Sequence, residues 1–95
     1  MPLTELEARL RPLARERIAQ NRLPCGATDR MWGGQGLGKP CSLCDQPITA
    51  EQVELEVEHP DEERGSTQVL RFHAVCHSIW QSECAHRAEL PKHSP

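Results

Sequence analysis

Large side chains are scarce in this sequence. The 95-residue chain has no tyrosine, one phenylalanine and two tryptophans. A chain this short removes only a modest share of its surface from water, and it can build only a small hydrophobic core from so few bulky residues. Small domains of this kind are commonly stabilised by a bound metal ion. The small number of large apolar side chains therefore favours a domain that is stabilised by a metal ion.

Long apolar runs are also missing. No stretch approaches the length that a membrane span requires, and the N-terminus has neither the basic leader nor the apolar run of a secretory signal. We therefore expect no membrane association and a cytoplasmic location. The five cysteines are an odd number. In a reducing cytoplasm, closely spaced thiolates serve metal binding or redox chemistry more often than disulfide bonding.

The charge of the chain is uneven. The net charge is −3, but residues 1–40 carry seven Lys/Arg against four Asp/Glu, whereas residues 41–95 carry four against ten. A nucleic acid would have to bind the N-terminal half, because cations drive phosphate binding. The arginines there alternate with glutamates, however, and such mixing is typical of a solvated helix face.

The first 24 residues (1–24) are expected to form a helical arm. Thr4 and Glu7 have the spacing of a capping box, and Leu6, Leu10 and Leu13 line one side of a helix over residues 5–20. Pro12 predicts either a bend or two short helices, because proline lacks the N–H and crowds the preceding turn. The apolar stripe would pack on the rest of the domain or on a second copy, so a monomer and a homodimer both stay open.

Residues 25–40 are predicted to be an irregular glycine-rich connector. Gly33 to Lys39 match the first part of a phosphate-binding P-loop, but Pro40 stands where the motif needs Ser or Thr, and no apolar strand precedes it. We therefore reject a nucleotide site. Met31 and Trp32 would either close the core or anchor a partner.

The C-terminal half predicts a hairpin and a helix. Val53, Leu55 and Val57 alternate with polar residues, as in a strand with one wet face, and a second short strand is expected at 69–72 after a turn at 59–66. From Ala74 the apolar period becomes helical, which predicts a helix over 74–88. Residues 89–95 are expected to be a flexible tail.

Two ligand pairs with the same gap flank the predicted hairpin. They are Cys41 and Cys44 in a Cys-x2-Cys turn, and His73 and Cys76 at the expected start of the helix. This spacing is typical of a structural zinc site, because four protein ligands close a tetrahedron and leave no open position for catalysis.

The other cysteines and a neighbouring histidine are not expected to be ligands. His77 is adjacent to Cys76, and neighbours on a helix point about 100° apart. Cys84 is expected to lie beneath Trp80 as a small apolar residue. Cys25 precedes the connector and would reach the ion only if the connector folded back.

The order of these features resembles a treble-clef zinc finger of the LIM type. The 28 residues between Cys44 and His73 also resemble the spacing in the finger of poly(ADP-ribose) polymerases. The resemblance covers residues 41–84 and implies that Cys41, Cys44, His73 and Cys76 bind zinc. LIM fingers are protein-binding adaptors, whereas the polymerase finger recognises DNA breaks. The predicted hairpin here is rich in carboxylates, which would repel phosphate.

We therefore expect an α+β protein with an arm (1–24), a connector (25–40), a treble-clef-like zinc domain (41–88) and a tail (89–95). The expected cofactor is one structural Zn²⁺. The expected function is that of a small regulatory or adaptor module that binds a protein partner. The alternative is a zinc-finger protein that binds DNA or RNA through its Arg-rich arm. An enzyme is not expected.

Overall fold

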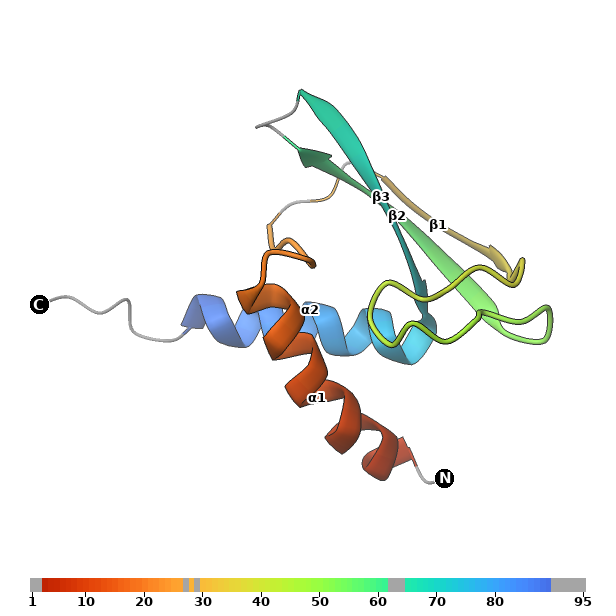
Figure 1. The fold of residues 1–95 in the computed structure, drawn as a ribbon, viewed down its shortest axis with the longest axis horizontal. Coiled ribbons are helices and arrows are strands. Elements are labelled where there is room, and N and C mark those ends of the chain that lie inside the picture. Colours follow the sequence, from red (N-terminus) through yellow and green to blue (C-terminus); the bar gives the residue numbers. More distant parts are fainter. Residues whose placement is uncertain (1–2, 27, 29, 62–64, 90–95) are drawn as a thin grey trace, which may run out of the picture.

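The fold is seen in a computed structural model, which describes residues 3–26, 28, 30–61 and 65–89 (Figure 1). Two helices and a three-stranded antiparallel sheet make up the α+β architecture. Along the chain the elements are α1 (Leu3–Ala19), β1 (Arg30–Gln35), β2 (Val53–Asp61), β3 (Ser66–His73) and α2 (Ala74–Glu89). No helix in these ranges is long and apolar enough to span a membrane.

Helix α2 is the central element of the fold. It contacts β2 and β3 of the sheet and also contacts α1, which crosses α2 below the sheet in Figure 1. The α1 residues Leu10, Ala14 and Ile18 are buried, at the spacing of one helical face. Against the sheet, Trp80 of α2 stacks on Phe72 of β3 with ring centroids 4.8 Å apart. The N-terminal helix is therefore packed onto the rest of the protein.

Helix α1 is a single helix that contains Pro12, so the alternative of two short helices is wrong. The helix begins at Leu3, one residue before the expected cap at Thr4. The helix in the C-terminal half was predicted over 74–88 and is confirmed as Ala74–Glu89. The expected tail lies outside the described residues except for Glu89, which belongs to α2.

The hairpin is confirmed and is longer than predicted. β2 pairs with β3 from Glu54 opposite His73 to Asp61 opposite Ser66. The predicted turn at 59–66 is therefore partly strand, and residues 62–64 lie outside the described residues. Pro60 is tolerated in the central strand because β1 pairs with β2 only up to Glu58.

Strand β1 corrects the prediction of an irregular connector. Its six residues pair antiparallel with β2. The segment that follows runs close to another backbone, since a Cβ on Gly36 would lie 2.1 Å from the carbonyl oxygen of Thr49. A residue with a side chain cannot take this position unless the backbone moves. The glycines that resemble a P-loop thus form an edge strand and a close backbone crossing.

A disulfide bond joins Cys25 to Cys84, which corrects the expectation that Cys84 is a free apolar residue. The bond connects the segment after α1 to the second half of α2. Two further features place that segment, because Leu23 is buried and Trp80 Nε1 donates a hydrogen bond to the Pro24 carbonyl at 3.0 Å. The helical end of the protein is therefore cross-linked covalently. Disulfide bonds persist in oxidising surroundings, whereas the cytoplasm is reducing. The cytoplasmic location therefore stays a prediction.

Candidate metal centre

Four candidate ligands meet where the sheet joins α2. Their ligand atoms all lie within 4.8 Å of one another, which is close enough to hold one metal ion. They are Cys41 and Cys44 in the loop before β2, His73 at the end of β3 and Cys76 in the first turn of α2. These are the four residues that the sequence predicted. Cys41 and Cys76 are buried, and Cys44 and His73 are partly exposed.

A tight turn brings the first two ligands together. The Asp45 amide donates to the Cys41 carbonyl at 3.0 Å, and the Cys41 amide donates to the Gln46 carbonyl at 2.9 Å. Asp45 takes a positive φ of 65°, a conformation that Asp and Asn tolerate better than most residues. Inside the turn the Leu43 amide points at Cys41 Sγ, 3.4 Å away, and stabilises negative charge on that sulfur.

The turn is docked on the outer edge of β3 through Ser42. The Ser42 amide donates to the Arg71 carbonyl at 2.6 Å, and Ser42 Oγ accepts a hydrogen bond from the Arg71 amide at 3.0 Å. Arg71 lies two residues before His73 on the same strand. The pairing therefore fixes the position of the cysteine turn relative to the histidine ligand.

The orientation of His73 is fixed by a backbone group. Its Nε2 lies 3.2 Å from the Pro47 carbonyl oxygen. A carbonyl can only accept a hydrogen bond, so Nε2 carries a proton, and in the neutral imidazole Nδ1 then has the free lone pair. This is the usual arrangement of a metal-binding histidine, whose second ring nitrogen donates to an acceptor. The Nδ1 atom faces Cys44 and Cys76.

The two sulfur–nitrogen distances to His73 are close to those of a tetrahedral zinc site. Bond lengths of about 2.3 Å to sulfur and 2.0–2.1 Å to nitrogen place the ligand atoms of such a site roughly 3.5–3.8 Å apart. The Sγ atoms of Cys44 and Cys76 lie 3.4 and 3.8 Å from His73 Nδ1. A donor set of three thiols and one imidazole is also one that zinc prefers.

The thiol pKa values are those of a cluster that favours a cation. A hydrogen bond from the Cys76 side chain lowers the pKa of Cys41 to about 4. The same hydrogen bond, together with burial and the Cys41 charge, raises the pKa of Cys76 well above its ordinary value. Burial raises the pKa of Cys44. The protein alone thus stabilises one thiolate, whereas a divalent cation would favour all three.

The residues predicted not to be ligands lie apart from this group. His77 packs edge-on against Phe72 and Trp80, with ring centroids 5.8 Å from each. Burial lowers the pKa of its imidazole. Cys25 and Cys84 are bonded to each other. The count of cysteines could have indicated this bond, because three of the five are candidate thiol ligands and the other two can bond to each other.

An ion pair connects the metal centre to α1. Arg17, which is buried near the end of α1, donates to Asp45 Oδ2 at 2.5 Å. Asp45 directly follows the ligand Cys44. The helix therefore contacts the cysteine turn through a charged hydrogen bond, which is stronger than a neutral one.

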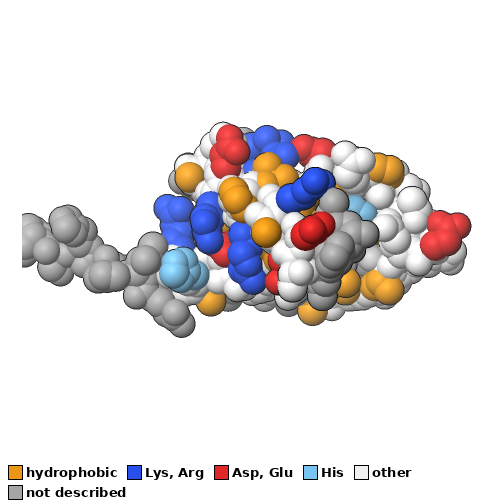
Figure 2. Space-filling view, turned by 90° about the horizontal axis from the view of Figure 1, so that it is seen from below, with side chains coloured by type: hydrophobic (Ala, Val, Ile, Leu, Met, Phe, Trp, Pro, Cys, Tyr) orange, Lys and Arg blue, Asp and Glu red, His pale blue; other side chains and the backbone are white. Residues whose placement is uncertain are grey.

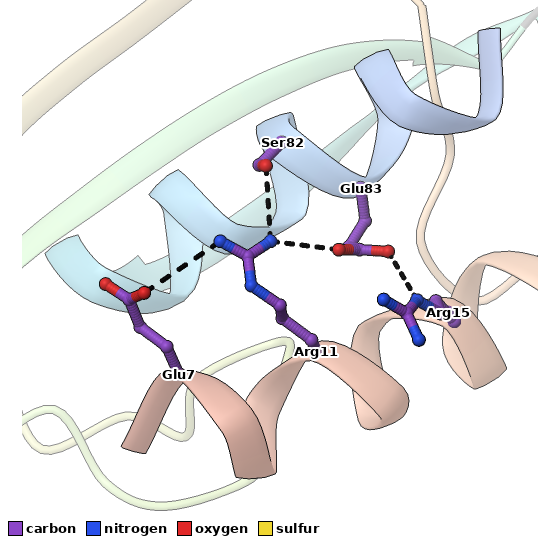
Figure 3. A network of polar contacts seen from close by, with 5 residues as sticks. All are labelled: Glu7, Arg11, Arg15, Ser82 and Glu83. Atoms are coloured by element: carbon purple, nitrogen blue, oxygen red, sulfur yellow. Dashed lines mark hydrogen bonds and ion pairs between the residues drawn. The ribbon is translucent and has the colours of Figure 1, made fainter. Parts of the chain in front are cut away.

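A second ion-pair network connects the two helices (Figure 3). The buried Glu83 of α2 accepts hydrogen bonds from Arg15 at 2.6 Å and from Arg11 at 2.9 Å. Burial alone would raise the pKa of Glu83, but the hydrogen bonds and the positive charges of Arg15 and Arg11 together outweigh it and hold the pKa below its ordinary value. The network fixes the crossing of α1 over α2.

Comparison with known proteins does not assign the chain to a family. No protein-family model, no curated protein and no solved structure matches the chain.

Proposed function

We propose that this chain is a zinc-binding module in which one Zn²⁺ has a structural role. The observation that carries the proposal is the closed group of Cys41, Cys44, His73 and Cys76. The histidine tautomer and the ligand distances suit zinc. Four protein ligands complete the tetrahedron without water, so the module is not an enzyme that acts through this ion.

We further propose a finger of the treble-clef type. The support is the order of the elements: a cysteine turn, the β2–β3 hairpin, and a helix whose first turn supplies Cys76. In this arrangement the metal joins the cysteine turn to the end of the hairpin and the start of α2. The additional strand β1 and helix α1 would then be extensions around the finger.

We assign the module an adaptor role, in which it binds another protein. The support is the set of large apolar side chains that the fold leaves exposed. Among the described residues, the exposed large apolar side chains are Met31, Trp32, Leu37, Val53 and Val69. Trp32 is 46% exposed although the chain has only two tryptophans. Exposed aromatic residues of this kind are common anchors at protein interfaces.

Nucleic-acid binding through the N-terminal arginines is the alternative. Lys and Arg side chains gather near the C-terminal end of α2 in Figure 2. Three arginines of α1 are already paired with carboxylates, however: Arg11 and Arg15 with Glu83, and Arg17 with Asp45. Cations that are already paired have less to gain from phosphate. We therefore favour a protein partner.

The metal proposal is tested by measuring zinc in the purified protein, with one Zn²⁺ per chain as the expected result. His73→Ala should lower zinc affinity by orders of magnitude, whereas His86→Ala, which changes an exposed histidine on α2, should leave it unchanged. Cobalt substitution should give the absorption of a tetrahedral thiolate site. A folded protein that contains no metal would refute the proposal.

The alternative is tested by measuring binding to DNA and RNA over a range of salt concentrations. A steep loss of affinity with salt would support nucleic-acid binding. No binding at low salt would exclude it.

A further inference from the structure

A hollow of about 690 Å³ lies directly beside the metal centre. Its volume is within the range of roughly 300–1,000 Å³ that is usual for ligand sites. The first part of α1, the segment from residue 44 to 53 and the start of α2 form its walls. The lining residues include Leu6 and Arg9 of α1, Pro47 and Val53 of the segment, and Val75 of α2.

The walls of this hollow are mainly apolar. Leu6 and Val75 are only partly buried, and Val53 is 55% exposed. Leu10 and Cys76, which also line the hollow, are buried. Apolar surface that stays accessible in a concave place is a common mark of a binding site.

Arg9 is the charged side chain of this hollow. Apart from the metal ligands, no other ionisable residue of the described ranges lines it. The Arg9 side chain is exposed, and no described carboxylate lies within ion-pair distance of it. The next arginines of α1 differ in this respect, since Arg11, Arg15 and Arg17 are all paired. A guanidinium beside an apolar hollow favours a ligand that combines apolar groups with a carboxylate.

The hollow is held open on two sides. The Arg17–Asp45 ion pair fixes α1 relative to the cysteine turn, and the hydrogen bond from Arg11 to Glu83 fixes it relative to α2. The metal ligands fix the opposite wall, since three of them line the hollow. A site that is already shaped loses less entropy when a ligand binds.

We propose that this hollow binds a short peptide segment of a partner protein, with apolar side chains in the hollow and an adjacent Asp or Glu on Arg9. This inference deepens the proposed adaptor function and rests on it. A peptide suits the site because the lining also offers polar side chains, including Gln46 and Gln52, that can hydrogen-bond to backbone groups.

The proposal is tested by selecting short random peptides against the zinc-loaded full chain and measuring the affinity of the enriched peptides. The expected consensus has two apolar residues and an acidic residue close together. Arg9→Glu should weaken binding by about tenfold or more, because it replaces an attraction by a repulsion. Arg22→Glu makes the same charge change at an exposed residue that does not line the hollow, and it should alter affinity by less than about twofold.

Zinc content and thermal unfolding are measured for every variant. Arg9→Glu should keep one Zn²⁺ per chain and an unchanged melting temperature. If Arg9 instead served to balance the charge of the thiolates, its variant would lose zinc affinity, and the proposal would be overturned. Val53→Glu places a charge in the hollow at a second exposed position and should also weaken binding.

Several results would overturn the peptide site. They are an absence of enrichment, a basic consensus, equal binding to the Arg9→Glu and Arg22→Glu variants, and NMR shifts confined to the free edge of β1. Each of these leaves the zinc proposal untouched. Conversely, a metal-free protein that still binds acidic peptides through Arg9 would refute the zinc proposal alone.

Discussion

The two ends of α2 are held in place by different chemistry. In its first turn, Cys76 joins the metal ligands of the cysteine turn and of β3. In its second half, Cys84 forms a disulfide bond with Cys25, and Glu83 pairs with two arginines of α1. With the proposed zinc bound, a small core would be supplemented twice along one helix, once by the metal ion and once by a covalent bond.

The two sets of cross-links respond to different conditions. Chelators and acid remove a metal, because its thiolate ligands must be deprotonated to bind. Reductants break the disulfide but leave thiolates available as ligands. The metal end and the helical end should therefore be separable by experiment.

Removal of zinc should have the largest effect. Structural zinc sites contribute binding free energies on the order of 10 kcal/mol to folding. On chelation, the amides of 41–48 and 73–76 should lose their protection from hydrogen exchange. The amides of α1 and of the second half of α2 should keep part of theirs, because the disulfide still connects them. An equal loss of protection at both ends of α2 would contradict the view that the two ends are stabilised independently.

Removal of the disulfide should come next. In the double variant Cys25→Ala, Cys84→Ala, the free energy of unfolding should fall by about 4 kcal/mol, since the bond closes a long loop with a sequence separation of 59. Denaturant unfolding at saturating zinc measures this value. Zinc stoichiometry should stay at one per chain. A loss of zinc would show that the two ends are not independent.

Substitution of Gly36, at the close backbone crossing, should lower the free energy of unfolding by a somewhat smaller amount. Gly36→Ala places a Cβ 2.1 Å from the Thr49 carbonyl oxygen, so we expect a destabilisation of about 3 kcal/mol, at the upper end of overpacking costs. Gly34→Ala is the matched control, because nothing lies within 4 Å of its added Cβ. Equal stability of the two variants would disprove the crossing.

The smallest of these effects concerns the helical end. Glu83→Gln removes a buried carboxylate that accepts two charged hydrogen bonds, and it should cost about 1–2 kcal/mol. Glu7→Gln is the control, since the Glu7–Arg11 pair at 3.9 Å should contribute only about 0.3–0.5 kcal/mol. Both values come from denaturant unfolding at neutral pH.

The contribution of Glu83 should also depend on pH in one direction. Its pKa is lowered in the folded protein, so the stabilisation is complete above the ordinary carboxyl pKa of the unfolded chain. It fades as the pH falls through the lowered pKa of Glu83. The difference in stability between the wild-type protein and Glu83→Gln should shrink over that acidic range. A stability difference that grows on acidification would contradict the predicted direction.

Much of the fold could be predicted because it is encoded locally. The leucine spacing of α1, the alternation from Val53 to Val57 and the change of period at Ala74 each reflect the buried face of one element. The grouping of the four candidate ligands could be predicted for a similar reason. The short gap within each pair places both of its side chains near one turn.

The features that the sequence did not reveal depend on distant partners. Strand β1 has two adjacent glycines and no alternation, and it is a strand because the free side of β2 supplies its hydrogen-bond partners. The disulfide joins residues that only the packing of the segment after α1 against α2 brings together. The hollow beside the metal centre likewise needs three separate elements.

The order of the cross-links along the chain bears on how the protein assembles. Cys25 and Cys84 lie outside the stretch from Cys41 to Cys76, so the loop closed by the disulfide encloses the loop closed by the metal ligands. Nested loops do not obstruct one another, and either can close first without threading. Closing the outer loop first would shorten the search for the inner contacts. With the proposed zinc, oxidation and metal uptake could therefore take place in either order.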